Sequence, residues 1–205
     1  MKDIVSLFQE IPTPCISDAL QGMNNLDPSI KPLKEQYRVA GRAFTVKMPV
    51  GDNHAVLRAI QEAKPDDILI IDAKGDMYHA VAGDFVVGIA QTLGIKGIIV
   101  DGVIRDIHEI RELNYPVFCK GITVAASGKA GGGEIGVPIS CGGVSIQPGD
   151  MIVGDVNGVV VVPRGMETTI LHKAMEKLKK DQERAELVSR DQEAVRKYLD
   201  SVLSK

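Results

Sequence analysis

Two hydrophobic periods alternate along the first two thirds of the chain. Between residues 39 and 113, short runs rich in Val and Ile alternate with stretches whose apolar residues recur every three or four positions. The runs at 43–48, 68–71 and 98–100 predict strands, and the stretches between and after them predict helices. A strand–helix order repeated in this way favours parallel pairing within one sheet.

The pattern changes on both sides of this region. From 116 to 162 the helical period disappears, and short strands with glycine turns are predicted, for example at 144–146, 151–155 and 159–162. The sequence therefore predicts an α/β fold with helices on one face of the sheet and a second β layer on the other. Residues 74–82 are polar and are expected to form a loop near the site.

The two ends of the chain are predicted to be helical. Residues 3–9 form a short helix in this prediction, and a second begins with Ser17 as its N-cap and ends at Gly22. No Gly or Pro occurs between Met166 and Lys205, and the apolar residues have near-helical spacing. A long amphipathic helix with a break near Ser189 is expected. Its narrow apolar stripe fits a helix covering its own subunit and equally one that reaches a neighbour.

Composition limits the possible functions. A length of 205 residues predicts one domain, and a net charge of −3 disfavours binding to nucleic acid. The three cysteines lack metal-ligand spacing and are expected to be reduced and buried. The chain shows neither a signal peptide nor an apolar run of 18 residues, so we expect a soluble, cytoplasmic protein without a membrane partner.

Residues 83–106 carry the strongest candidate site. Gly83 and Asp84 begin a predicted helix, and the free N–H groups of a helix start suit a small carboxylate. The strand at 98–100 opens into a segment carrying Asp101, Arg105 and Asp106, and ligands of open α/β sheets collect beyond such strand ends. An anion-binding helix start and an Arg-Asp pair are therefore expected to form two walls of one site.

Each charged residue of this segment has an alternative interpretation. Arg105 presents a planar fork suited to the carboxylate and keto oxygen of a 2-oxo acid, or else it pairs with Asp101 or Glu109 at the surface. Asp106 is either a ligand of a hard divalent cation, Mg²⁺ or Mn²⁺, or the N-cap of the following helix. Asp84 caps its helix, positions a catalytic water, or does both.

Other candidate groups have weaker patterns. The four histidines, with no HxxxH pair, are interpreted as structural or surface residues: His54, His79, His108 and His172. The run 129–133 lacks the Gly-Lys-Ser/Thr ending of a phosphate loop, so a flexible turn is expected. Lys74 and Lys96 remain formal candidates for a Schiff base.

The spacing Asp84-x20-Arg105-Asp106 resembles that of the 4-hydroxy-4-methyl-2-oxoglutarate aldolase family, which also contains the ribonuclease activity regulator A proteins. Further stretches resemble the family in its order, over roughly residues 10–165: Ser17-Asp18-Ala19-Leu20, Gly41-Arg42-Ala43-Phe44-Thr45-Val46, Gly51-Asp52-Asn53, Val100-Asp101-Gly102-Val103-Ile104-Arg105-Asp106, Pro116-Val117-Phe118, Cys141-Gly142-Gly143-Val144, Pro148-Gly149-Asp150 and Asp155-Val156-Asn157-Gly158-Val159-Val160-Val161-Val162-Pro163-Arg164.

The resemblance implies a swivelling β/β/α domain at 1–164 with a helical extension at 165–205 that packs on a neighbouring subunit. It implies a divalent-metal-dependent class II aldolase that cleaves a 4-hydroxy-2-oxo dicarboxylic acid to pyruvate and decarboxylates oxaloacetate through the same enolate. It also implies a ring-shaped homotrimer, or a hexamer formed from two such rings. The regulator branch implies an alternative: a non-enzymatic protein that binds and inhibits a ribonuclease.

The same resemblance assigns roles to individual residues. Arg105 binds substrate and stabilises the enolate, and Asp84 acts with a catalytic water. Asp106 holds the metal, largely through its coordinated waters. The substrate carboxylate is bound by Gly83, Asp84, Phe85 and Val86. An acidic residue of the neighbour's C-terminal helix, Asp181 or Glu183, enters the site.

Overall fold

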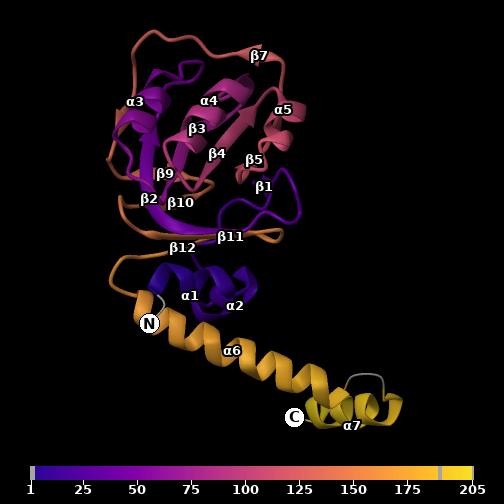
Figure 1. The fold of residues 1–205 in the computed structure, drawn as a ribbon. Helices are drawn as coiled ribbons and strands as arrows, with labels where there is room; N and C mark the ends of the chain where they lie inside the picture. The colour runs from indigo at the N-terminus through magenta and orange to yellow at the C-terminus, as the bar shows by residue number, and fades with distance from the viewer. Residues whose placement is uncertain (1–2, 189–190, 205) are drawn as a thin grey trace.

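The computed structural model describes residues 3–188 and 191–204 and shows a mixed α/β body from which a helical arm projects (Figure 1). The centre of the body is a sheet with the strand order β1-β5-β4-β3-β2-β11-β12. Four of these strands pair in parallel: β2 (Val39–Lys47), β3 (Asp67–Ala80), β4 (Gly97–Ile104) and β5 (Val117–Cys119). The parallel pairing expected from the alternating periods is thus confirmed.

The remaining strands are shorter and lie around this centre. Antiparallel pairing adds β1 (Lys31–Pro32) beside β5, and β11 (Met151–Asp155) with β12 (Gly158–Val162) beside β2. Three two-residue strands attach near the end of the parallel strands: β6 (Gly121–Ile122), β7 (Ala125–Ala126) and β8 (Glu134–Ile135). A separate hairpin consists of β9 (Ile139–Cys141) and β10 (Val144–Ile146).

Three apolar cores hold the layers together. One joins the sheet to the helices α3 (His54–Glu62), α4 (Asp84–Thr92) and α5 (Ile107–Glu112), which lie together over one face in Figure 1. A second lies between the sheet and the β9–β10 hairpin. The third packs α1 (Ile4–Glu10), α2 (Thr13–Ala19) and the first part of α6 (Glu167–Val188) against β11 and β12. The predicted α/β class, with helices on one side and a second β layer on the other, is confirmed.

Three local predictions were wrong. The expected loop at 74–82 is mostly strand, because β3 continues to Ala80 through two register shifts that expose its polar residues. Ser17 does not cap α2, which begins at Thr13 with Pro12 in the N-cap position. Asp101 does not lie beyond its strand, because β4 continues to Ile104 and is buried along its whole length.

A buried carboxylate fixes α2 to the turn between β11 and β12. Asp155 accepts hydrogen bonds from the backbone N–H and hydroxyl of Thr13 at 2.9 and 2.7 Å, and from the backbone N–H of Asn157 at 2.8 Å. Burial alone would raise the pKa of Asp155, but these hydrogen bonds outweigh it and hold the pKa below its ordinary value.

We therefore expect Asp155→Ala to lower the free energy of unfolding by about 2 kcal/mol at pH 7, because buried N–H donors lose their acceptor. The folded pKa of Asp155 is depressed, so its contribution is complete above the unfolded value of about 3.9 and is lost as the pH falls through the folded value. Urea titrations at pH 7 and about pH 3 should show the difference from wild type shrinking in acid. The exposed Asp200→Ala is the control, and an equal loss in both variants would contradict the assignment.

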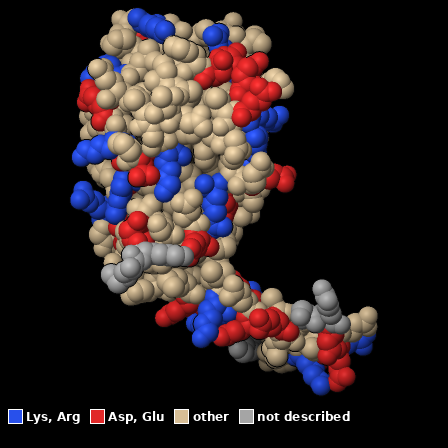
Figure 2. Space-filling model, in the orientation of Figure 1, with Lys and Arg blue, Asp and Glu red and all other residues tan. Residues whose placement is uncertain are grey.

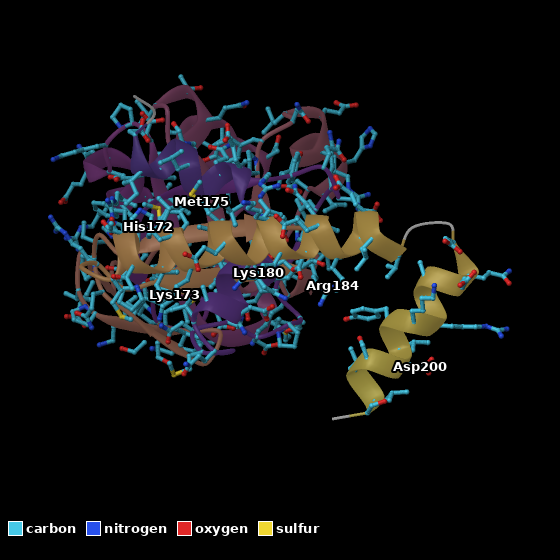
Figure 3. All side chains as sticks on the ribbon, turned by 90° about the horizontal axis from the view of Figure 1, so that it is seen from below. His172, Lys173, Met175, Lys180, Arg184 and Asp200 are labelled. Carbon is cyan, nitrogen blue, oxygen red and sulfur yellow. The ribbon has the colours of Figure 1, made fainter. Side chains whose placement is uncertain are left out.

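The C-terminal arm consists of α6 and α7 (Gln192–Leu203), where a long helix with a break near Ser189 was expected; Ser189 itself lies outside the described residues. The first turns of α6 cover the chain's own body through buried Ile170, Leu171 and Ala174. Figure 3 shows α6 crossing the lower face and α7 beyond its edge, and α7 buries none of its residues. Basic and acidic side chains are interspersed along this arm (Figure 2).

The cysteines Cys15, Cys119 and Cys141 are free and buried, as expected. Burial raises the pKa of all three thiols, that of Cys119 to about 11. Among the helices of the described residues, none combines the length and apolar character needed to cross a membrane.

Candidate active site

The end of β4 and the start of α4 meet at a pocket of about 290 Å³. Six of the residues predicted for the site line it: Gly83, Asp84, Phe85, Val86, Arg105 and Asp106. The structure thus brings together two segments that are twenty residues apart in the chain. Both segments reach the pocket because α4 follows β3 and Arg105 follows β4, its parallel neighbour.

The start of α4 supplies unpaired donors to this pocket. Gly83 occupies the N-cap position without a side-chain capping bond, and the first bond of the helix joins the N–H of Val87 to the carbonyl of Gly83 at 3.1 Å. The N–H groups of Asp84, Phe85 and Val86 therefore precede the intrahelical ladder. Together with the positive end of the helix dipole, they form a binding place for an anion.

Asp106 sits at the opposite wall in an unusual backbone conformation. It occupies the N-cap position of α5 with φ of 57° and ψ of 44°, the left-handed region that residues other than glycine rarely adopt. Its carboxylate makes no capping hydrogen bond, so the helix-cap interpretation explains its place in the chain but not its side chain. Oδ2 lies 3.3 Å from Nε of Arg105, and the carboxylate is directed into the pocket region.

Gly83 is what allows these two walls to approach each other. A Cβ atom at this position would lie 2.2 Å from Oδ2 of Asp106 and 3.3 Å from Nε of Arg105. Carbon and oxygen atoms cannot approach to 2.2 Å without bonding, so any side chain here would displace the helix start or the carboxylate. The glycine is required by close approach, because its φ of −120° is available to any residue.

Arg105 does not form either of the surface pairs that the sequence left open. Its backbone N–H donates to the carbonyl of Ala82 at 3.1 Å, which joins the two walls, and its side chain pairs with Asp106. Asp101 instead lies inside β4, where its carboxylate contacts Nζ of Lys120 at 2.6 Å and accepts from the N–H of Gly142 at 2.9 Å. Asp101 therefore belongs to the interior and not to the pocket.

Sequence reasoning missed three polar residues that line the pocket: Asn53, Ser127 and Lys129. Asn53 is 7% exposed; its Nδ2 donates to the carbonyl of Val81 at 3.0 Å, while its Oδ1 has no partner among the described residues. The Ser127 hydroxyl donates to the carbonyl of Ala80 at 2.8 Å. The only sequence signal was the Gly51-Asp52-Asn53 motif, since the segment around Lys129 has no hydrophobic period.

The donor set suits a hard cation that keeps part of its water shell. The lining includes the carboxylates of Asp84 and Asp106, and the described residues contain no group of three or more His, Cys, Asp or Glu side chains that could enclose a metal. Magnesium is commonly bound through one or two carboxylates with several waters retained. The Asp106 carboxylate, which makes no capping bond and pairs with Arg105 at 3.3 Å, fits this mode and does not fit a zinc site.

The other candidate groups lie outside the pocket. Nζ of Lys74 lies 2.5 Å from Oδ2 of Asp72. Lys96 directly precedes β4, at the end of that strand opposite to Arg105. His79 bonds Asp76 through Nδ1 at 2.8 Å, and the pocket lining includes none of the four histidines. Lys129 is the lysine that the described structure places in the lining.

The two acids proposed to come from a neighbour are engaged within their own helix. Asp181 contacts Nζ of Lys177 at 3.0 Å and Nη2 of Arg184 at 2.7 Å, and Glu183 contacts Nζ of Lys179 at 3.7 Å. Neither lines the pocket of its own chain. A role for either acid in a neighbour's site stays a prediction.

Comparisons with known proteins identify the family of this chain. A family model described as RraA-like, Aldolase/RraA, matches residues 13–161. A Halalkalibacterium halodurans protein provisionally named 4-hydroxy-4-methyl-2-oxoglutarate aldolase is 54% identical over 201 residues, covering 98% of this chain and 96% of that protein.

Solved structures show the same fold. RraAS2 of Streptomyces coelicolor, from the RNase ES inhibitor RraA protein family, is 28% identical with a TM-score of 0.79, over 87% of this chain and 94% of that one. The RNA-processing inhibitor RraA from Thermus thermophilis is 29% identical with a TM-score of 0.69, over 75% of this chain and 93% of that one. By its sequence and its fold, this chain belongs to the RraA-like family.

Proposed function

We propose that the protein is a divalent-metal-dependent class II aldolase that cleaves a 4-hydroxy-2-oxo dicarboxylic acid, of the 4-hydroxy-4-methyl-2-oxoglutarate type, to pyruvate. Decarboxylation of oxaloacetate is part of the proposal, because both reactions pass through the enolate of pyruvate. The observation that carries it is the meeting, in one pocket, of an uncapped helix start, an arginine fork and a carboxylate free of capping bonds. The provisional name of the 54% identical relative supports the same reaction.

The chain's own groups would hold the 2-oxo acid end of the substrate. Its carboxylate fits the N–H groups at the start of α4, where helix dipole and unpaired donors coincide. Arg105 reaches the same space with a planar fork that can bind a carboxylate oxygen and the keto oxygen together. Asp106 would hold the divalent cation. When bound, Mg²⁺ or Mn²⁺ supplies Lewis-acid polarisation of the keto oxygen.

The bond that breaks in both substrates is C3–C4. In the aldol substrate the C4 hydroxyl passes its proton to the water held by Asp84 and becomes a carbonyl, while the bonding electron pair moves through C3 to the C2 oxygen. In oxaloacetate the same electron pair moves to the C2 oxygen as carbon dioxide leaves. Arg105 stabilises the negative charge that develops on this oxygen. Asp84, whose carboxylate is exposed at the pocket, positions a water that returns a proton to C3 and yields pyruvate.

The direct test measures pyruvate release from oxaloacetate and from 4-hydroxy-4-methyl-2-oxoglutarate. We expect turnover with Mg²⁺ or Mn²⁺, loss of turnover in EDTA, and recovery when the metal is added back. Metal in buffer without protein corrects for spontaneous decarboxylation. Turnover that survives EDTA would contradict metal dependence and direct attention to Lys129 as an amine nucleophile.

A second candidate is a regulator that binds and inhibits a ribonuclease. The likeness to the Thermus RNA-processing inhibitor favours it. That likeness covers 93% of the inhibitor but 75% of this chain, so this chain has segments without a counterpart there. A folded protein without turnover on either acid would move this candidate to the front.

The proposal includes a homotrimer or homohexamer without a nucleic-acid or membrane partner. Exposed apolar residues of the arm support assembly, since no described part of the same chain covers them: Leu187, Val195, Leu199, Val202 and Leu203. If these residues of one subunit packed on a second copy, the arm could carry the α6 acids of that subunit, Asp181 and Glu183, towards the pocket of its neighbour. Light scattering of the full chain measures the subunit number.

A further inference from the structure

A carboxylate behind the pocket holds the glycine-rich loop of residues 128–133. Asp52 is 6% exposed and lies just before α3. Its Oδ2 accepts from the N–H of Gly131 at 2.9 Å and of Gly132 at 3.4 Å. Its Oδ1 accepts from the N–H of His54 at 2.8 Å. One side chain thus bonds the start of α3 and a loop about eighty residues further along the chain.

The carboxylate is ionised when it makes these contacts. The N–H of His54 and those of the loop hold the pKa of Asp52 below its ordinary value, although burial opposes them. Hydrogen bonds to a charged acceptor are stronger than bonds between neutral groups. These bonds tie the 128–133 loop to the start of α3, and the flexibility expected of this turn stays a prediction.

Backbone contacts fix the same loop at its other positions. The N–H of Gly128 donates to the carbonyl of Gly51 at 2.7 Å, and its carbonyl accepts from the N–H of Asn53 at 3.0 Å. A Cβ atom on Gly132 would lie 2.7 Å from Cγ of Pro49, so the loop lies flush against the segment before α3. Residues 129 and 130 therefore lie between two residues whose backbones are hydrogen-bonded, Gly128 and Gly131.

One of these two residues is Lys129, the lysine of the pocket lining. Lys129 follows Gly128, which is bonded on both sides, and precedes Gly131, which is bonded to Asp52. Lys129 is exposed and is one of the lining residues of the pocket that Arg105 and Asp106 also line. Asp52, which bonds the loop on which Lys129 lies, is outside that lining.

We propose that Asp52 is a positioning residue of the active site, which clamps the 128–133 loop so that the Lys129 ammonium is held at the pocket wall. This inference rests on the proposed function, because a dicarboxylic substrate has an anionic group that the Lys129 ammonium could meet. An Asx turn at the start of α3 would explain the bond to His54 alone. The bonds to Gly131 and Gly132 are what that role leaves unexplained.

Asp52→Ser separates the two roles. A serine hydroxyl can still accept from the N–H of His54 in a local turn, but it is too short to reach the loop. Hydrogen exchange of the full-length protein should show faster exchange at Gly131 and Gly132, by about tenfold or more, as their charged acceptor is lost. Amine acylation of Lys129 should also accelerate relative to Lys173 on α6. Neither readout requires catalysis, and unchanged rates would overturn the clamp whatever the activity.

Kinetics then test whether the clamp acts through Lys129. For 4-hydroxy-4-methyl-2-oxoglutarate, Asp52→Ser and Lys129→Met should each raise KM about tenfold, the effect of losing one charge-assisted contact. The double variant should be no worse than Lys129→Met alone, because both changes remove the same interaction. Independent, multiplying effects would overturn the positioning role. Gly132→Ala, which displaces the loop from its other side, should reproduce the KM increase with Asp52 intact.

Two failures can be told apart. If the wild-type protein has no turnover, the proposed function fails while exchange and acylation still decide the clamp. If turnover is normal and Asp52→Ser leaves exchange, acylation and KM at wild-type values, the clamp fails and the proposed function stands.

Discussion

Replacing Gly83 by alanine should lower kcat/KM for pyruvate release by about a hundredfold or more, the cost of a displacement near 1 Å in reacting geometry. The added methyl group would lie 2.2 Å from Oδ2 of Asp106 and 3.3 Å from Nε of Arg105. Either the start of α4 or the carboxylate must move, and both hold ligands in the proposed mechanism. Steady-state rates and a Mg²⁺ titration of activity would show weaker metal use together with the lower rate.

Gly88 offers a matched control on the same helix. A Cβ atom there meets nothing within 4 Å, and the residue lies inside α4. Gly88→Ala should keep the wild-type rate and stabilise the fold by about 0.5–1 kcal/mol, since glycine is unfavourable within a helix. A folded Gly83→Ala protein with the wild-type rate would contradict the assignment of the pocket.

The second large effect is expected for Arg105→Lys, with a decrease in kcat of about 10²–10³-fold, as for loss of a donor to a developing oxyanion. Lysine keeps the positive charge but loses the planar fork that can bind two oxygens at once. The measurement is kcat and KM for both proposed substrates at saturating metal. Both substrates should lose rate in the same proportion, because the enolate is common to them.

Arg111→Lys controls for the general effect of this substitution. Arg111 lies on α5, exposed, with its Nε donating to the carbonyl of Leu33 at 3.3 Å. It should retain wild-type kinetics. Wild-type kcat in Arg105→Lys would show that charge alone suffices and would contradict bidentate binding.

The part of the site that could be located from sequence consists of two short motifs, each of consecutive residues. Gly83 to Val86 combine a glycine with the first turn of an amphipathic helix, and Arg105 and Asp106 follow a β-branched run. Both patterns involve neighbouring residues in the chain, so they can be recognised without knowledge of the fold. The chemical roles come from the resemblance and stay predictions until they are measured.

The missed residues depend on contacts between distant segments. Lys129 reaches the pocket because Asp52 and Gly51 bond its loop, and no periodicity encodes such bonds. Asp101 was misplaced because the β-branched run ends at Val100, although β4 continues to Ile104 with every residue buried. The end of β3 was misplaced because its polar residues face solvent beyond a register shift.

The pocket is built from four separate stretches of chain, at 53, 80–86, 105–106 and 126–129. Two parallel strands can pair only after the long connection between them has closed. Their pairing is therefore a late event in folding. A nascent chain that has not reached residue 126 lacks one wall of the pocket, even when the Arg-Asp pair is already synthesised. The pocket lining is therefore complete only after the last of the four stretches has been synthesised and has packed against the others.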